Sequence, residues 1–189
     1  PQRRPPIGPN WCLDPFRADR TVCGTEAIES AVNTISDSEA KRIQVTRSYP
    51  VAEPGMDVGL SEACRLAALL CHRPMAAVEL VLEDAVVLVA SAGLKSGRIA
   101  RSEALSPEFL DSRAVVVVSD ARCDRRFSDR RLVRDPRGIR FYGAVPLVSP
   151  EGCAVGVLSV WDYEAGDLLP SQSESLEALG RMDVSYTHL

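Results

Sequence analysis

The chain has 189 residues, of which 46% are hydrophobic and 25% are charged, and its formal net charge is −4. This composition is that of a globular protein with a core, and it excludes a wholly disordered chain. The acidic balance argues against a dedicated nucleic-acid-binding domain, which is usually basic as a whole. The sequence shows neither an apolar run of transmembrane length nor a signal-peptide pattern, so we expect a cytoplasmic protein.

The first 55 residues are expected to form a linker and a helical extension. The opening segment PQRRPPIGP holds four prolines in nine residues, which fix φ and remove backbone donors, so regular structure cannot form there. From Thr25 to Arg42, small and β-branched residues recur at helical spacing and predict a helix with a narrow apolar stripe. That stripe fits a seam between two copies of the chain or a remnant of a preceding domain. Residues 48–55 then interrupt the chain with two prolines and a glycine, where we place a domain boundary.

After this break the pattern predicts a helix followed by a β-hairpin. Ser61 can cap the helix, apolar residues repeat at helical spacing behind it, and Pro74 ends it. The runs MAAVELVL and AVVLVASAG, joined by two acidic residues, are typical of two strands and a tight turn. Residues 101–113 form a polar, partly helical connector, and residues 114–120 a short buried strand.

An arginine-rich segment comes next, DARCDRRFSDRRLVRDPRGIRFYGAVPL. Eight arginines fall within residues 121–140, together with three aspartates. We interpret it as a structural loop in which Asp124 and Arg126 pair with each other or with the backbone and Phe127 anchors the loop to the core, because a guanidinium can bind carboxylates and carbonyls while its stem covers apolar surface. A phosphate contact and a nucleic-acid patch are the alternatives. The absence of aromatic residues alternating with the arginines disfavours the second.

The last elements are a second hairpin and a helix. The runs GIRFYGAVPLV and CAVGVLSVWD flank a turn, SPEG, and PSQSESLEALGRM begins with Ser171 and Glu174 at capping-box spacing. The predicted elements follow one another as helix, hairpin, connector, strand, loop, hairpin and helix. This order predicts an α+β fold, a central antiparallel β-sheet with helices packed on one face. Residues 183–189 are expected to be a tail outside the domain, for which an artefactual origin stays open.

From Met56 to Met182 the sequence resembles a GAF domain, the small sensory module of bacterial signalling proteins. The residues that carry the resemblance are VVSDARCDRRFSDRRLV, IRFYGAVPLVSPEGCAVGVLSVWD and the closing helix. The resemblance implies a GAF/PAS-like sheet and a domain order of 1–55 as extension, 56–182 as sensory domain and 183–189 as tail. It further implies a regulatory domain without catalytic activity, cut from a multidomain protein such as a histidine kinase or a diguanylate cyclase, whose effector domain lies outside this chain.

In GAF domains ligands sit between one sheet face and the connector segments, so the resemblance also implies a pocket for an unknown small molecule. It implies a homodimer formed through the flanking helices, and no nucleic-acid partner. Strand alternation leaves open which of the two apolar faces holds the pocket. The candidate ligand-binding residues are Glu79, Phe127, Phe141, Tyr142, Gly143, Val145, Val157, Ser159 and Trp161.

Cysteine and histidine chemistry supplies the competing hypotheses. The six cysteines show no CxxC spacing, and the only histidines, His72 and His188, have no second ligand nearby, so we expect reduced thiols, no metal and no cofactor. The pair formed by Cys71 and His72 is similar to the chromophore-binding pair of phytochrome GAF domains but lies too early in the chain. A GAF-fold free-methionine-sulfoxide reductase is the enzymatic alternative, with Cys123, which is surrounded by arginines, as its reactive thiol.

Overall fold

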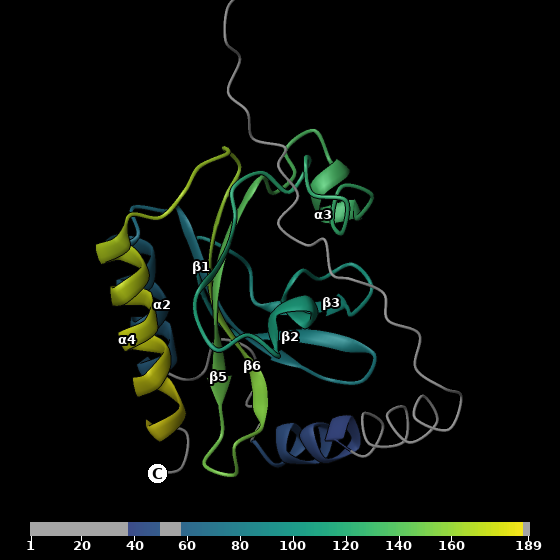
Figure 1. Ribbon diagram of the computed structural model, residues 1–189, viewed down its shortest axis with the longest axis vertical. Coiled ribbons are helices and arrows are strands. Elements are labelled where there is room, and N and C mark those ends of the chain that lie inside the picture. Colours follow the sequence, from purple (N-terminus) through teal and green to yellow (C-terminus); the bar gives the residue numbers. More distant parts are fainter. Residues whose placement is uncertain (1–37, 50–57, 187–189) are drawn as a thin grey trace, which may run out of the picture. The chain divides into compact units, whose positions relative to one another are not determined.

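The strands of the second hairpin pair with those of the first to form one six-stranded sheet in the order β3-β2-β1-β6-β5-β4, antiparallel throughout. The structure, a computed structural model, describes residues 38–49 and 58–186 (Figure 1). The elements in chain order are a helix over 38–48, α2 (Val58–Leu70), β1 (Met75–Val81), β2 (Ala85–Ala92), β3 (Gly97–Ala100), the 3₁₀ turn η1 (Ser106–Phe109), β4 (Val116–Val118), α3 (Arg131–Arg134), β5 (Phe141–Val148), β6 (Ala154–Asp162) and α4 (Pro170–Tyr186).

Both predicted hairpins are confirmed, and β1 and β6 meet at the centre of the sheet. Two details of the prediction were wrong. The sequence analysis missed β3, whose four residues alternate between half-buried and exposed. Strand β4 is shorter than predicted and only one of its three residues is buried, because it forms the edge of the sheet beside β5.

Helices α2 and α4 lie side by side on one face of the sheet, as predicted (Figure 1). The side of α2 that faces the sheet carries small residues, among them Cys64 and Ala67, which are fully buried. A Cβ built on Gly180 of α4 would come within 2.6 Å of a methyl of Val145. Small residues therefore let both helices approach the strands closely, and this face closes with apolar contacts. We call it the helix face.

The opposite face is covered by η1 and by the arginine-rich segment. Leu105 and Phe109 reach the sheet from the connector, and Phe127, Val133 and Ile139 from the loop, all with at most 4% of their surface exposed. We call this the connector face. The central strands are therefore covered on both faces, which explains why β1 is buried at all seven positions.

The helix over 38–48 lies against the end of the first hairpin. Arg42 forms a bidentate pair with Glu39 at 2.6 and 2.9 Å, and its Nη1 donates to the carbonyl of Val81 at 2.7 Å. Arg101 also pairs with Glu39 at 2.8 Å. The predicted helix from Thr25 to Arg42 overlaps this helix, but its residues before 38 and the break at 50–57 lie outside the described residues.

At the other end of the domain, α4 continues past Met182 to Tyr186. Four residues of the segment predicted as a tail are thus helical.

Candidate functional site

The centre of the connector face holds a buried carboxyl group. Glu79 lies in the middle of β1, directly opposite Val157 of β6, and only 1% of its surface is exposed. The register between β1 and β2 shifts at Val78 and Glu79, and a bulge of this kind re-aims the neighbouring side chains. No arginine or lysine contacts the carboxyl group among the hydrogen bonds and ion pairs of the described residues.

Three polar side chains from β5 and β6 surround this carboxyl. The Tyr142 hydroxyl donates to Glu79 Oε1 at 2.9 Å, and the Ser159 hydroxyl makes a short hydrogen bond to the same oxygen. The Trp161 Nε1 donates to Ser159 Oγ at 2.6 Å. All three side chains are buried, with Trp161 the most exposed at 4%.

The hydrogen bonds indicate a protonated carboxyl. Ser159 Oγ also lies 3.2 Å from the carbonyl oxygen of Ala77, and its single proton cannot serve that carbonyl and Glu79 at once. A protonated Glu79 removes the conflict, since it donates to Ser159, which then donates to Ala77. Burial raises the pKa of Glu79, and the nearby donor groups of Ser159, Ser106, Tyr142 and Trp161, which favour the charged form, oppose that rise.

Aromatic rings enclose the polar group. Tyr142 lies 5.6 Å from Trp161 and 5.7 Å from Phe109, and Phe109 lies 5.6 Å from Phe127, measured between ring centroids. Burial also raises the pKa of the Tyr142 phenol well above its usual value, followed by the effect of the nearby Glu79. The site therefore combines one carboxyl, one neutral phenol and an indole N–H within an aromatic layer.

The structure divides the nine predicted site residues between the two faces. Glu79, Tyr142 and Trp161 lie on the connector face, together with Phe127, Val157 and Ser159. Phe141, Gly143 and Val145 lie on the helix face, so the sheet separates them from Glu79. Their positions on β5 alternate with Tyr142, and strand parity sends them to the other side.

Sequence reasoning missed two residues of the site, Ser106 and Phe109 of η1. Both are buried, and Ser106 lies near enough to Glu79 to affect its pKa, although its hydroxyl has no hydrogen-bond partner of regular geometry. The connector was predicted as polar and partly helical, and nothing in its local pattern indicates that it reaches a strand 27 positions earlier in the chain.

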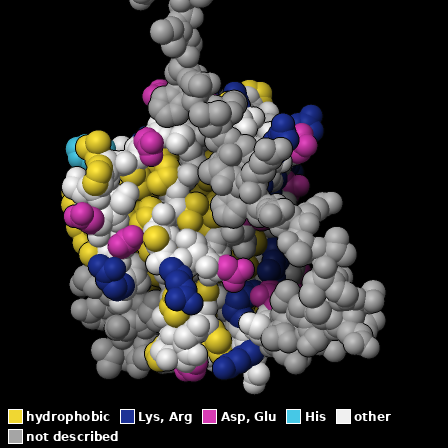
Figure 2. Space-filling model, viewed as in Figure 1, with side chains coloured by type: hydrophobic (Ala, Val, Ile, Leu, Met, Phe, Trp, Pro, Cys, Tyr) yellow, Lys and Arg dark blue, Asp and Glu magenta, His cyan; other side chains and the backbone are white. Residues whose placement is uncertain are grey.

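The arginine-rich segment is a loop held by carboxylates, as its structural interpretation predicted. Arg126 pairs with Asp124 at 2.7 Å, Arg130 with Glu108 at 2.8 Å, and Arg140 with Asp120. Arg140, as hydrogen-bond donor, holds the pKa of Asp120 below its usual value. On the face shown in Figure 2, basic and acidic side chains alternate, and those drawn in colour form no broad basic patch.

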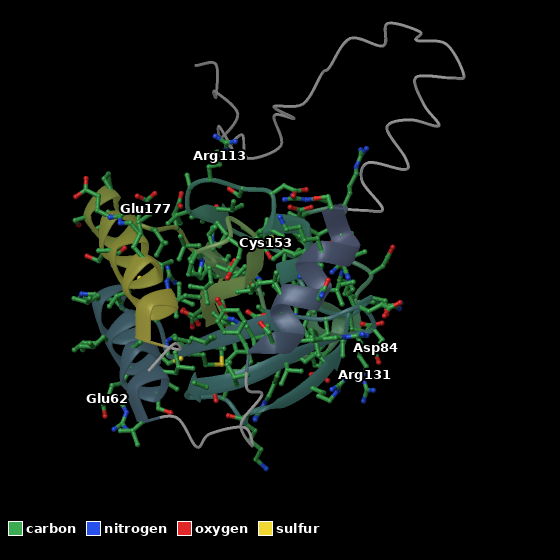
Figure 3. The ribbon with its side chains drawn as sticks, turned by 90° about the horizontal axis from the view of Figure 1, so that it is seen from below. Glu62, Asp84, Arg113, Arg131, Cys153 and Glu177 are labelled. Atoms are coloured by element: carbon green, nitrogen blue, oxygen red, sulfur yellow. The ribbon has the colours of Figure 1, made fainter. Side chains whose placement is uncertain are left out.

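The cysteines that the structure describes do not gather around the site. Cys64 in α2 and Cys71, directly after it, belong to the helix face, and burial raises the pKa of the Cys71 thiol to about 11. Cys123 follows β4 near the start of β5, whereas Cys153 lies in the turn after the end of β5. An eight-residue strand separates those two, roughly 25 Å of chain. Figure 3 shows Cys153 well apart from Arg131, which belongs to the same loop as Cys123.

Neither a metal nor a membrane site emerges from the described residues. Within 38–49 and 58–186, no three histidine, cysteine or acidic side chains are grouped as metal ligands. In the same part of the chain, no helix has both the length and the apolar character needed to cross a membrane.

An antiparallel sheet with paired helices on one face and a polar site beneath connector loops on the other defines a small α+β module. The sequence profile of the GAF domain family matches residues 56–182. The chain therefore belongs to the GAF domain family, and the resemblance found in the motifs is confirmed.

Known proteins similar to the chain include signalling proteins and enzymes. A cyclic di-GMP phosphodiesterase of Pseudomonas aeruginosa is 29% identical over 153 residues, which are 80% of this chain and 26% of that protein. The chain thus spans about a quarter of the length of this curated relative.

Two solved structures share the fold. The GAF domain of an Acinetobacter phosphoenolpyruvate-protein phosphotransferase has a TM-score of 0.58 at 18% identity, over 82% of this chain and 93% of that one. The type II free methionine-R-sulfoxide reductase from Thermoplasma acidophilum has a TM-score of 0.56 at 14% identity, over 69% of this chain and 90% of that one.

These comparisons correct one expectation. The sequence analysis excluded enzymatic activity, but the curated relative is a phosphodiesterase and a reductase shares the fold. The exclusion was wrong because it rested on missing motifs within one domain, whereas the matched relative is named as an enzyme and an enzyme shares the fold.

Proposed function

We propose that residues 56–182 are the sensory or regulatory domain of a multidomain signalling protein and that a small ligand binds at the Glu79 site. One observation carries this proposal. A carboxyl group with no cationic partner among the described residues lies fully buried in the central strand, bound to Tyr142 and Ser159. Burying such a group costs stability, whereas an apolar residue there would extend the core. A group that breaks the local packing rule in this way marks a functional position.

The chemistry of the site favours an organic ammonium ligand. A carboxylate supplies the counter-charge, and aromatic faces attract a cation through their quadrupole. Tyr142, Trp161 and Phe109 provide these faces around Glu79. On binding, the ligand would take the place of the proton on Glu79.

A thermal-shift series tests the proposal. We expect primary and quaternary alkylammonium ions to raise the unfolding temperature at pH 8, and neutral isosteric alcohols to leave it unchanged. The matched control is Glu79→Gln, which keeps the shape of the side chain and one acceptor but cannot carry charge. A shift of equal size in the variant, or no shift with any ammonium ion of the series in the unmodified chain, contradicts the proposal.

The proposal extends to partners and location. We propose a location in a bacterial cytoplasm, since the six cysteines of the sequence show no CxxC spacing or other disulfide pattern. The similarity to a phosphodiesterase supports a covalently linked effector domain that acts on a signalling nucleotide, in place of the kinase or cyclase named above as examples. The ligand would regulate that effector through the flanking helices.

Dimerisation is proposed for the outer surface of α2. Val58, Leu66, Leu69 and Leu70 are 43–74% exposed there, and a groove of about 570 Å³ runs from Ala68 to Arg73. We expect a dimer in light scattering that Leu69→Glu converts to a monomer. Val148→Glu, at an equally apolar but isolated site at the end of β5, should leave the dimer intact. A monomeric unmodified chain would remove this part of the proposal.

A further inference from the structure

The covering of the Glu79 site differs in construction from the rest of the domain. It consists of η1 and of residues 121–134. We call residues 121–134 the arginine cover. Neither segment forms a strand of the sheet. In the chain, η1 precedes β4, and residues 121–134 lie between β4 and β5. Side chains hold the arginine cover to the molecule together with the backbone hydrogen bonds from Ala121 to Arg140 and from Ile139 to Leu132, and no ladder of backbone hydrogen bonds attaches it. Attachments of this kind open at a lower free energy than sheet strands do.

The arginines of the cover stack on the aromatic layer of the site. The Cζ of Arg126 lies 4.8 Å from the ring centre of Phe127 and 5.4 Å from that of Phe109, and the Cζ of Arg130 lies 4.9 Å from Phe127. Phe109 in turn stacks on Tyr142, which holds Glu79. An unbroken series of contacts thus links the surface guanidinium groups to the buried carboxyl.

Two contacts fasten the arginine cover to the connector between β3 and β4. Arg130 Nη2 donates to Glu108 of η1 at 2.8 Å, and the backbone N–H of Arg131 donates to Glu103 at 2.6 Å. The Glu108 side chain is 43% exposed, so salt can screen this pair. A third pair, between Arg126 and Asp124, lies within the loop and fastens nothing.

The closed cover leaves polar atoms unsatisfied. Arg130 Nη1 of the arginine cover and Ser106 Oγ of η1 are buried and, among the described residues, have no hydrogen-bond partner of regular geometry. A buried donor without a partner opposes the state that buries it, because water would satisfy it in an open state. The two orphan groups therefore lower the free energy of opening.

From this arrangement we propose that the arginine cover is a lid over the Glu79 site, fastened by Arg130–Glu108 and Arg131–Glu103, and that its opening admits the ligand. The entry of a ligand through the lid rests on the proposed function, whereas the opening itself needs no ligand. It gives the arginine-rich segment a role beyond structural support, because the same arginines that hold the loop also control access.

Acrylamide quenching of Trp161 fluorescence tests the lid. Trp11→Phe removes the second tryptophan of the chain, so that the signal reports the site alone. In that background we expect Glu108→Gln to raise the quenching constant about twofold, with the unfolding midpoint unchanged, since only the fastening is weakened. The matched control is Glu83→Gln, which removes the exposed pair between Arg47 and Glu83 on the hairpin. An unchanged constant in Glu108→Gln, or an equal rise in both variants, overturns the proposal.

Hydrogen exchange on the unmodified chain keeps the test independent of mutation. Raising NaCl to about 1 M should speed the exchange of amides in 106–109 and 121–134, because the fastening is screened, and leave those of β5 and β6 unchanged. Equal exchange at low and high salt would contradict the lid. A chain that opens in this way but binds no ammonium ion would refute the proposed function and leave the lid standing.

Discussion

The two faces of one sheet are closed in opposite ways. On the helix face, two regular helices pack small and aliphatic side chains against the strands, and Leu158, Val160 and Leu176 are fully buried. On the connector face, irregular segments bring aromatic rings to a carboxyl, a phenol and a hydroxyl. Side chains alternate along the same strands, so one stretch of β6 serves both faces.

The difference separates stability from function. The helix face gains free energy from apolar area removed from water and holds no charged group among its buried residues. The connector face buries the carboxyl group of Glu79, which lowers the stability of the fold and forms the centre of the candidate site. Substitutions on the two faces should therefore differ in kind as well as in size.

The largest effect is expected where the two central strands approach most closely. A Cβ built on Gly156 would lie 1.8 Å from the backbone oxygen of Glu79, so Gly156→Ala must push β6 away from β1. We expect a loss of about 3 kcal/mol or more in the free energy of unfolding, measured by urea titration. Gly97 of β3 has nothing within 4 Å of the same position, and Gly97→Ala is the control. Comparable stability of the two variants would show that the strands are not held this closely.

Truncation on the helix face comes next. Leu158→Ala leaves a cavity against α2 and should cost about 3 kcal/mol. Burial raises the pKa of the Cys71 thiol to about 11 and that of the Tyr49 phenol above its usual value of 10, so both groups stay neutral in acid and at neutral pH, and the loss should be the same from pH 4 to pH 8. Leu66→Ala, at a residue 46% exposed on the outer side of α2, should change little. A pH-dependent loss in Leu158→Ala would break the proposed division between the faces.

The helix over 38–48 provides a charged contact for comparison. Arg42→Ala removes the donor that holds Glu39 and the Val81 carbonyl, and we expect a loss of about 2 kcal/mol because Glu39 is partly exposed. The Arg42 hydrogen bond lowers the pKa of Glu39 from 4.5 to about 2. The stabilisation is therefore present above pH 4.5 and disappears as the pH falls towards 2.

Urea titrations of both proteins between pH 7 and pH 2 check this contact. The stability difference between the unmodified chain and Arg42→Ala should shrink in acid. A difference that stays constant would mean that Glu39 is not the partner that matters.

The smallest change in stability is expected for Glu79→Gln, and its sign distinguishes it from the other substitutions. Burial raises the pKa of Glu79 in the folded state, so its contribution is fully present below the unfolded value of 4.5 and is lost as the pH rises through the folded value. Glu79→Gln cannot ionise, so it should gain about 1 kcal/mol over the unmodified chain at alkaline pH and nothing at pH 4. Thermal unfolding across this range measures the difference, and a pH-independent difference refutes a protonated Glu79.

The sequence predicted much of the fold because its signals are local. The alternation in both hairpins and the helical spacing before Pro74 each depend on neighbouring residues, and both are confirmed. The capping box of Ser171 and Glu174 was wrong, because α4 begins at Pro170 and it is the Gln172 side chain that accepts a hydrogen bond from the backbone N–H of Leu169. Strand β3 was missed because four residues with a glycine give almost no alternation to detect. Edge strands of this length are stabilised by the neighbouring strand and not by their own pattern.

The site was only partly predictable for a related reason. Strand parity groups Tyr142, Ser159 and Trp161 only when the pairing of β5 with β6 is known, and the sequence left the choice of face open. Phe141, Gly143 and Val145 were assigned to the same pocket because they are neighbours in sequence. Ser106 and Phe109 depend on a contact across the sheet that no local pattern encodes.

One measurement tests the central claim, that the connector face is built around a buried protonated carboxyl. Carbon-13 NMR of glutamate side-chain carboxyls, followed from pH 3 to pH 9, reports each titration, and the spectrum of Glu79→Gln assigns the signal of Glu79. We predict one carboxyl with a pKa above the usual 4.5, absent from the variant. If every glutamate titrates at or below the usual value, Glu79 is charged in the folded protein and the account is wrong.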